Sequence, residues 1–145
     1  MKVVYSDLKN KRVFISGGGS GIGATIVEHF CEQKSEVYFI DIDLKSSNKL
    51  IKNIKKKGYR VPKFIECNIL DVKKLQNIIE DIISKKGAIH CLINSAANDD
   101  RHTTEQVDEK YWENRMGINL KHYFFAAQAV VKGMKKIKSG SIVNL

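Results

Sequence analysis

The amino-acid sequence predicts an α/β fold in which helices cover both faces of a doubly wound parallel sheet. Short apolar runs of strand length alternate along the chain with longer segments in which apolar residues recur at helical spacing. The first apolar run also leads directly into a glycine-rich loop that opens a helix. Because crossovers between parallel strands are right-handed, successive helices are expected on both faces of the sheet.

The glycine-rich loop, residues 15–23, follows the buried strand 13–15 and precedes a helix. Gly17 permits a sharp exit from the strand, Gly21 permits close approach of a pyrophosphate, and Gly23 permits tight packing of the helix on the sheet. The helix N-terminus offers free N–H groups to phosphates. The alternative is a tight turn that binds nothing. The loop predicts a dinucleotide site with contacts from Gly17, Ser20, Gly21, Ile22 and Gly23.

A carboxylate follows the second apolar run, residues 37–40, at Asp41. It lies in the window, about 20 residues after the glycines, where an acid binds the ribose hydroxyls of a dinucleotide. A negative charge there repels a 2′-phosphate, so the sequence favours NAD over NADP as cofactor. The alternatives for Asp41 are a helix N-cap or a solvated turn residue.

The first helix is expected to end near Lys34. The residues expected on its inner face are Ile22, Ile26, Val27 and Phe30. The second strand covers residues 36–40, and the lysine-rich helix after it ends near Gly58, a plausible C-cap. The formal net charge of +9 is concentrated there, but leucine and isoleucine interleave with the lysines at helical spacing. This pattern favours a solvated lysine face, with nucleic-acid binding as the weaker alternative.

The second half of the chain repeats the alternation. The third strand covers about 61–67, and Asp71 is expected to cap a helix that ends near Gly87. The fourth strand covers 89–93, a long helix runs from Asp108 to Lys136, and the fifth strand begins at Gly140. Because this helix is apolar on nearly every side around residues 120–131, it must be covered on two faces.

Length and composition predict one domain over residues 1–145. The sequence has no signal-peptide pattern and no apolar run long enough to span a membrane, so a cytoplasmic location is expected. Cys31, Cys67 and Cys91 lie far apart without Cys-x-x-Cys spacing. They predict buried free thiols rather than disulfides or metal ligands.

Four motifs in the same order resemble those of the short-chain dehydrogenases/reductases. Residues 16–23 resemble the glycine motif, with Ser16 where threonine is usual, and residues 94–97 resemble Asn-Asn-Ala-Gly. The resemblance implies a Rossmann-like sheet with strand order 3-2-1-4-5. The cofactor contacts that it implies are Asn68, Ile69, Asn94 and Ala96. Asn119 matches the asparagine that holds a proton-relay water, which implies a catalytic role.

A finer resemblance, in residues 96–102 and 124–129, is to the NAD-dependent aldose 1-dehydrogenases of this family. It implies oxidation of a sugar at the anomeric carbon to a lactone. A polar loop after the fourth strand would hydrogen-bond the sugar, since ligands of such sheets bind beyond the strand ends. The residues expected to do so are Asn98, Asp100, Arg101 and His102. The alternative is a surface loop whose acid and arginine pair with each other.

In this family the catalytic Ser, Tyr and Lys follow the fifth strand, whereas this sequence ends at Leu145. Tyr123 does not replace the catalytic Tyr, because Ala127 stands where a lysine is needed. The expectation is therefore a cofactor-binding front portion, truncated after the fifth strand. Its function is that of an oxidoreductase lineage, or of a non-catalytic NAD-binding or assembly module. Homo-oligomerisation is expected through the helix 108–136 and the exposed edge of the fifth strand.

Overall fold

The fold is built on one parallel sheet with strand order β3-β2-β1-β4-β5, as the sequence and its family resemblance predict. The computed structural model describes residues 3–145. Every neighbouring pair of strands is parallel. The strands are β1 (Arg12–Ser16), β2 (Glu36–Asp41), β3 (Lys63–Glu66), β4 (Cys91–Asn94) and β5 (Ser141–Asn144).

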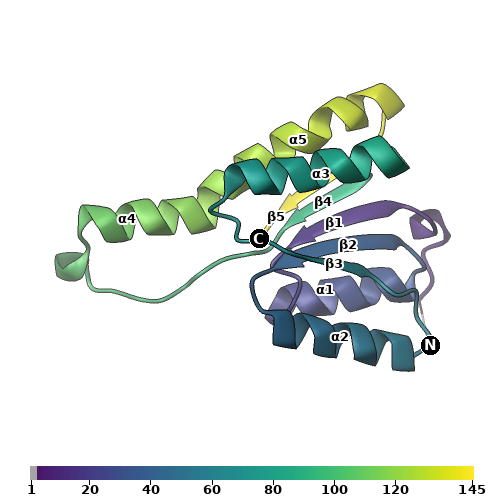
Figure 1. Ribbon diagram of the computed structural model, residues 1–145, viewed down its shortest axis with the longest axis horizontal. Coiled ribbons are helices and arrows are strands. Elements are labelled where there is room, and N and C mark those ends of the chain that lie inside the picture. The colour runs from purple at the N-terminus through teal and green to yellow at the C-terminus, as the bar shows by residue number, and fades with distance from the viewer. Residues whose placement is uncertain (1–2) are drawn as a thin grey trace.

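Helices form a layer on each face of the sheet (Figure 1). One layer holds α1 (Gly21–Glu32) and α2 (Leu44–Lys56), and the other holds α3 (Val72–Lys86) and α5 (His122–Ile137). Alternate residues of a strand point to opposite faces. Accordingly, Val13 and Ile15 pack in the α1–α2 core, whereas Phe14 packs in the α3–α5 core. Short 3-10 turns lie at Ser6–Leu8 and Thr104–Gln106.

Side chains and glycines define several helix ends. Asp71 accepts a hydrogen bond from the backbone N–H of Lys74 and caps α3, as predicted. The N-cap of α2 is Asp43, which accepts from Ser46 N–H, so the alternative that Asp41 caps this helix is wrong. Gly58 and Gly87 have positive φ angles just beyond α2 and α3, which fits the predicted helix ends.

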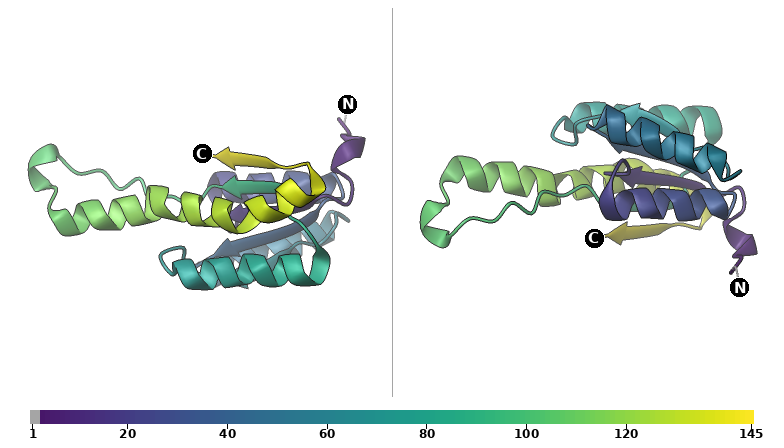
Figure 2. Two further views of the ribbon diagram at one scale, coloured as in Figure 1. Left: turned by 90° about the horizontal axis from the view of Figure 1, so that it is seen from above. Right: turned by 90° about the horizontal axis from the view of Figure 1, so that it is seen from below.

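The predicted helix 108–136 has three parts. They are α4 (Glu109–Met116), a π-helical segment (Gly117–Lys121) and α5. None of the residues of α4 is buried, and this helix extends beyond the sheet as an arm (Figures 1 and 2). The prediction of helix is confirmed, while the π-helical segment was not foreseen, because the apolar pattern continues through it.

The prediction that Ile22 lies on the buried face of α1 is wrong. Ile22 is 71% exposed, because the start of α1 lies at the end of the sheet rather than over it. Within this single chain the long helix is covered on one face, and cover of the other face by a helix or a partner stays a prediction. Its buried side chains in α5 are His122, Ala126, Val130 and Met134. Phe124, on the opposite face, is 65% exposed.

The lysine-rich helix α2 has the predicted amphipathic character. Leu50 and Ile54 are buried against the sheet, while Lys45, Lys49 and Lys52 are exposed, as expected for a solvated face. Cys31, Cys67 and Cys91 are free thiols; Cys31 and Cys67 are buried, as predicted, whereas Cys91 is only partly buried. Across residues 3–145, no helix has the length and apolar character needed to cross a membrane.

Candidate functional site

A cavity of about 680 Å³ lies at the carboxyl ends of the strands. Its volume falls within the range typical of small-molecule sites, about 300–1,000 Å³. The predicted site residues that line it are Gly17, Ser20, Gly21, Ile22, Gly23, Asp41, Asn68, Ile69, Ala96 and Asn98. The lining residues that were not among the predicted contacts include Ile42, Asp43, Cys67, Ser95, Asp99 and Ile118.

The glycine loop forms a cradle that side chains would fill. Gly17 has a φ of +68°, and a methyl group there would lie 2.6 Å from Cα of Ala96. A methyl group at Gly23 would overlap the carbonyl of Gly17, which is why α1 can pack so close to the loop. Gly21 has a φ of +53° and open space where its side chain would be. This geometry fits a pyrophosphate held by backbone groups.

The N-terminus of α1 adjoins the cavity. Ser20 is the N-cap residue, but its side chain makes no capping hydrogen bond. The N–H groups of the first turn have no acceptor within the helix, and the helix dipole places partial positive charge beside them. The arrangement therefore suits phosphate oxygens.

Asp41 is the last residue of β2, and its carboxylate is held by backbone groups. Oδ2 accepts from the N–H of Gly19 at 2.8 Å, and Oδ1 accepts from the N–H of Asp43 at 2.9 Å. Gly19 has no side chain to separate the loop from this carboxylate, and a methyl group there would lie 2.9 Å from Cγ of Asp41. The negative charge is thereby fixed at one end of the cavity.

Asn68 and Ile69 line the cavity directly after β3. The Asn68 Oδ1 accepts from the N–H of Leu70 at 3.0 Å, which fixes the side chain in a turn. Within residues 3–145 its amide nitrogen makes no hydrogen bond. That nitrogen is therefore an available donor for a ligand.

Asn94 and Ser16 lie beneath the cavity rather than in its wall. Asn94 is fully buried, and its Nδ2 donates to Oδ1 of Asn144 at 2.8 Å, which ties β4 to β5. Ser16 Oγ accepts from the N–H groups of Ser95 and Ala96 at 3.1 and 3.3 Å. Both residues therefore support the lining without contacting the cavity.

Asn119 clamps the loop after β4. Its Oδ1 accepts from Asn98 N–H at 2.8 Å, and its Nδ2 donates to Asn98 carbonyl oxygen at 2.9 Å. The residue belongs to the π-helical segment and does not line the cavity. This contact places Asn98 at the cavity wall, while the catalytic role implied for Asn119 stays a prediction.

The remaining predicted substrate residues lie along the arm. Asp100 forms an ion pair with Arg115 of α4 at 3.1 Å. The alternative, an ion pair between an acid and an arginine that both belong to the loop, is therefore not observed in the described residues. The rings of His102 and Tyr111 are in contact, tilted by 42° with centroids 4.1 Å apart. Asp100, Arg101 and His102 do not line the cavity, so the structure brings only Asn98 of this group to it.

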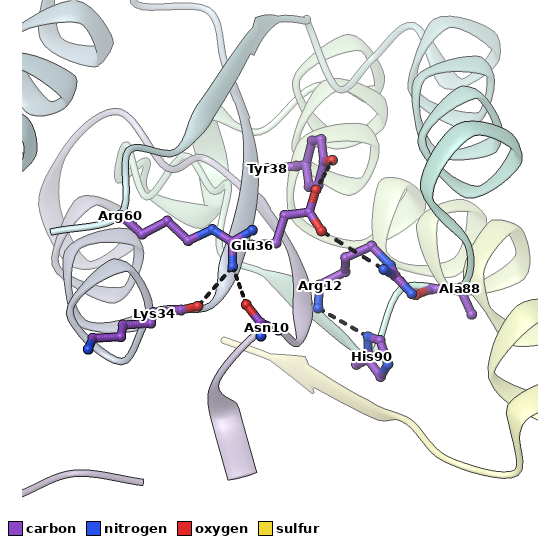
Figure 3. Close-up of polar contacts among 8 residues, drawn as sticks. All are labelled: Asn10, Arg12, Lys34, Glu36, Tyr38, Arg60, Ala88 and His90. Atoms are coloured by element: carbon purple, nitrogen blue, oxygen red, sulfur yellow. Dashed lines mark hydrogen bonds and ion pairs between the residues drawn. The ribbon is translucent and has the colours of Figure 1, made fainter. Parts of the chain in front are cut away.

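A second polar cluster lies at the amino end of the sheet, where its groups satisfy one another (Figure 3). Arg12 Nε donates to the carbonyl of Ala88 at 2.9 Å, and its guanidinium lies 3.9 Å from the Glu36 carboxylate. Tyr38 donates its hydroxyl hydrogen to Glu36, and burial together with this bond raises the pKa of Tyr38 to about 12. His90 Nδ1 accepts from Arg12 N–H. These contacts join β1 and β2 to the segment that precedes β4.

Tyrosine and lysine four residues apart occur twice, as Tyr5–Lys9 and Tyr59–Lys63. Neither pair lines the cavity. Tyr59 hydroxyl donates to Glu32 on α1, beside the second cluster rather than the glycine loop. The spacing alone therefore does not supply a general base to this site.

A parallel sheet with a glycine loop, a helix N-terminus and an acidic residue around one cavity defines a dinucleotide-binding Rossmann-type domain. The sequence profile described as short chain dehydrogenase matches residues 11–145. The chain belongs to the short-chain dehydrogenase family.

Named relatives agree with this membership. The chain is 38% identical over 142 residues to D-xylose 1-dehydrogenase of Caulobacter vibrioides (strain NA1000 / CB15N), covering 97% of this chain and 55% of that protein. It is 38% identical over 140 residues, with the same coverage, to "Probable galactose dehydrogenase GalD" of Rhizobium meliloti (strain 1021). The structure of ligand-free aldohexose dehydrogenase of Thermoplasma acidophilum matches with a TM-score of 0.81 and 26% identity, over 97% of this chain and 50% of that one. The chain spans about half the length of the curated relatives it matches.

Proposed function

We propose that these residues form the NAD-binding half of a short-chain dehydrogenase that oxidises an aldose at its anomeric carbon to a lactone. The observation that carries the proposal is the convergence of the glycine loop, Asp41 and Asn98 on one cavity. Similarity to dehydrogenases named for galactose, xylose and aldohexoses supports the choice of substrate class.

Each part of the cavity has a role toward the cofactor in this proposal. The backbone of Gly17–Gly23 and the first turn of α1 bind the pyrophosphate. Asp41, already oriented by Gly19, accepts from the ribose hydroxyls and repels a 2′-phosphate, which gives preference for NAD over NADP. Asn68 donates its amide hydrogens to the adenine. The bound nicotinamide would accept the hydride from the sugar carbon.

The sugar would reach the cavity beside Asn98, at the end of β4. Its anomeric hydroxyl must also lose a proton to a base. In the resemblance described above, that base is a tyrosine carried beyond the fifth strand. For the 145 residues alone, the expected behaviour is NAD binding with little or no turnover.

Calorimetric titration with NAD and with NADP tests the cofactor part of the proposal. We expect one saturable site for NAD and weaker binding of NADP. The Asp41→Asn variant removes the charge with little change of shape. It should bind NAD more weakly, and the difference between its affinities for NAD and NADP should be smaller than in the wild type. No binding of either cofactor at millimolar concentration would refute the proposal.

An assay of NADH formation with galactose and xylose tests the substrate part. Turnover by the 145 residues would show that another group replaces the family's base, and it would refute the mechanism. A protein that carries the segment beyond the fifth strand should turn over an aldose. Turnover of other alcohols with no activity on aldoses would refute the substrate class while leaving the NAD proposal intact.

We also propose that copies of this chain associate through the long helix and the edge of β5. Apolar side chains on one side of the helix are exposed at intervals of four residues, at Trp112, Met116, Leu120 and Phe124. All residues of β5 are exposed, and this strand is paired only on the side of β4. Unpaired edges and exposed apolar patches favour association.

A further inference from the structure

His122 is a buried polar side chain to which neither the family motifs nor the proposed cofactor contacts assign a task. It is the first residue of α5 and is fully buried. Burial of an imidazole is costly unless the ring nitrogens have partners. Its hydrogen bond is with Ser16, whose Oγ lies 3.3 Å from Nε2 of His122, and its ring also packs edge-on against Tyr123.

The hydrogen bonds of Ser16 determine which ring nitrogen carries the proton. Ser16 Oγ lies 3.1 Å from Ser95 N and 3.3 Å from Ala96 N. A hydroxyl has two acceptor positions and one hydrogen, and a backbone N–H can only donate. Both acceptor positions are therefore taken, and the hydroxyl hydrogen is left for Nε2 of His122. The ring must be neutral, with its proton on Nδ1.

This tautomer follows from the hydrogen bonds of Ser16. Within the described part of the chain Nδ1 makes no hydrogen bond. Burial lowers the pKa of His122, and a contact with the backbone of Ile118 partly offsets that effect. Ile118 belongs to the π-helical segment and lines the cavity. His122 therefore lies between the π-helical segment and the end of β1.

The hydrogen bond between His122 and Ser16 affects the cavity wall formed by residues 95–98. Asn119 holds one end of this segment through the backbone of Asn98. His122 acts on the other end through Ser16, which holds the backbone of Ser95 and Ala96. Ala96 in turn packs against Gly17 of the glycine loop. One stretch of helix thus fixes both ends of the wall that faces the loop.

We propose that His122 is a positioning residue for the cofactor. By accepting the Ser16 hydroxyl hydrogen at Nε2, it directs the two acceptor positions of Ser16 toward Ser95 and Ala96 and so holds the wall at the place where the cofactor packs. The inference rests on the proposed function, in which this cavity binds NAD.

Calorimetric titration of NAD into the 145-residue chain tests the inference with four variants. His122→Leu keeps a buried side chain but removes the acceptor, and we expect its Kd for NAD to rise about tenfold, equivalent to about one hydrogen bond. His122→Gln offers an amide oxygen and should recover part of the affinity. Ser16→Ala should weaken binding similarly, and His122→Leu should add nothing further in the Ser16→Ala background.

The matched control is Val130→Ala, a buried position on the same helix that packs in the α3–α5 core. It should lower stability and leave the Kd for NAD unchanged. If it raises the Kd as much as His122→Leu does, His122 is merely structural and the inference is wrong. If the wild type binds NAD and His122→Leu binds it equally well, the inference is overturned while the proposed function survives.

Nitrogen NMR of the His122 ring provides a readout without cofactor. We expect a neutral ring protonated at Nδ1, with an Nε2 signal that shifts in the Ser16→Ala variant. A proton on Nε2 would overturn the inference. A wild type with this tautomer that does not bind NAD would refute the proposed function, and the positioning role would fall with it.

Discussion

At the residue scale, Gly17 combines a positive φ angle with close packing against Ala96. Gly17→Ala should lower the free energy of unfolding by about 3 kcal/mol, because the new methyl group meets backbone atoms and the φ angle is strained. NAD binding should be lost as well. Urea unfolding at neutral pH measures the first effect and calorimetry measures the second.

Gly58 is the matched control for this prediction. Its φ is +72°, close to that of Gly17, but no atom lies within 4 Å of the position that a methyl group would occupy. Gly58→Ala should therefore cost about 1 kcal/mol, the conformational part alone. Equal losses for the two variants would show that the close approach of Gly17 to Ala96 is unimportant.

His122 also gives an expectation for acid stability. Burial lowers the pKa of His122 from 6.5 to about 4. On acidification the unfolded chain therefore binds a proton at His122 before the folded protein does. The contribution of neutral His122 to the free energy of unfolding is fully present above pH 6.5 and is lost as pH falls toward 4. The loss amounts to about 3 kcal/mol, since one pKa unit corresponds to about 1.4 kcal/mol.

Urea unfolding of the wild type and of His122→Leu across this pH range measures that contribution. The variant should lose less stability on acidification than the wild type. The stability of the variant should still fall somewhat with falling pH, because burial and the charges of Arg12 and Lys11 also lower the pKa of His90. Identical pH dependence in both proteins would show that His122 titrates normally.

The same residues show how far a sequence can be interpreted without a structure. The glycine loop and Asp41 could be identified because their function depends on short spacings after strands, which are local properties. His122 could not, because Ser16 is 106 positions away and the pairing depends on how α5 packs. A weak signal existed: His122 heads an apolar series, at intervals of four residues, that continues with Ala126 and Val130.

At the scale of elements, the arm formed by α4 is a helix that does not pack against the sheet. α4 has eight residues, none buried, whereas α5 packs against α3 and the sheet. Because isolated short helices are marginal in water, α4 should be much less stable than α5. Hydrogen exchange should therefore show rapid exchange in Glu109–Met116 and slow exchange around Ala126 and Val130.

The control for this comparison is α3, which is of similar length to α5 and packs in the same core. Its buried positions should exchange as slowly as those of α5. Protection of α4 equal to that of α3 would show that something covers the arm in solution. Sequence periodicity could not distinguish an exposed α4 from a covered one. It predicts helix over 108–136 without showing that the sheet lies under α5 and not under α4.

At the scale of the whole molecule, the one-sided burial of the long helix leads to a prediction about self-association. Phe124 lies 65% exposed on the face opposite α3 and the sheet. Phe124→Glu should weaken association, because a charge on a buried apolar interface is costly to desolvate. Sedimentation velocity over a concentration series should show association in the wild type and a smaller assembly in the variant.

Val61→Glu is the matched control, since Val61 is also an exposed apolar residue but precedes β3, at the opposite edge of the sheet. It introduces the same charge and should leave association unchanged. If both variants dissociate the assembly equally, the cause is net charge rather than the helix face. A wild type that stays monomeric at high concentration would refute association through this face and the β5 edge. It would leave the NAD proposal unaffected, because the cavity lining comes from one copy of the chain.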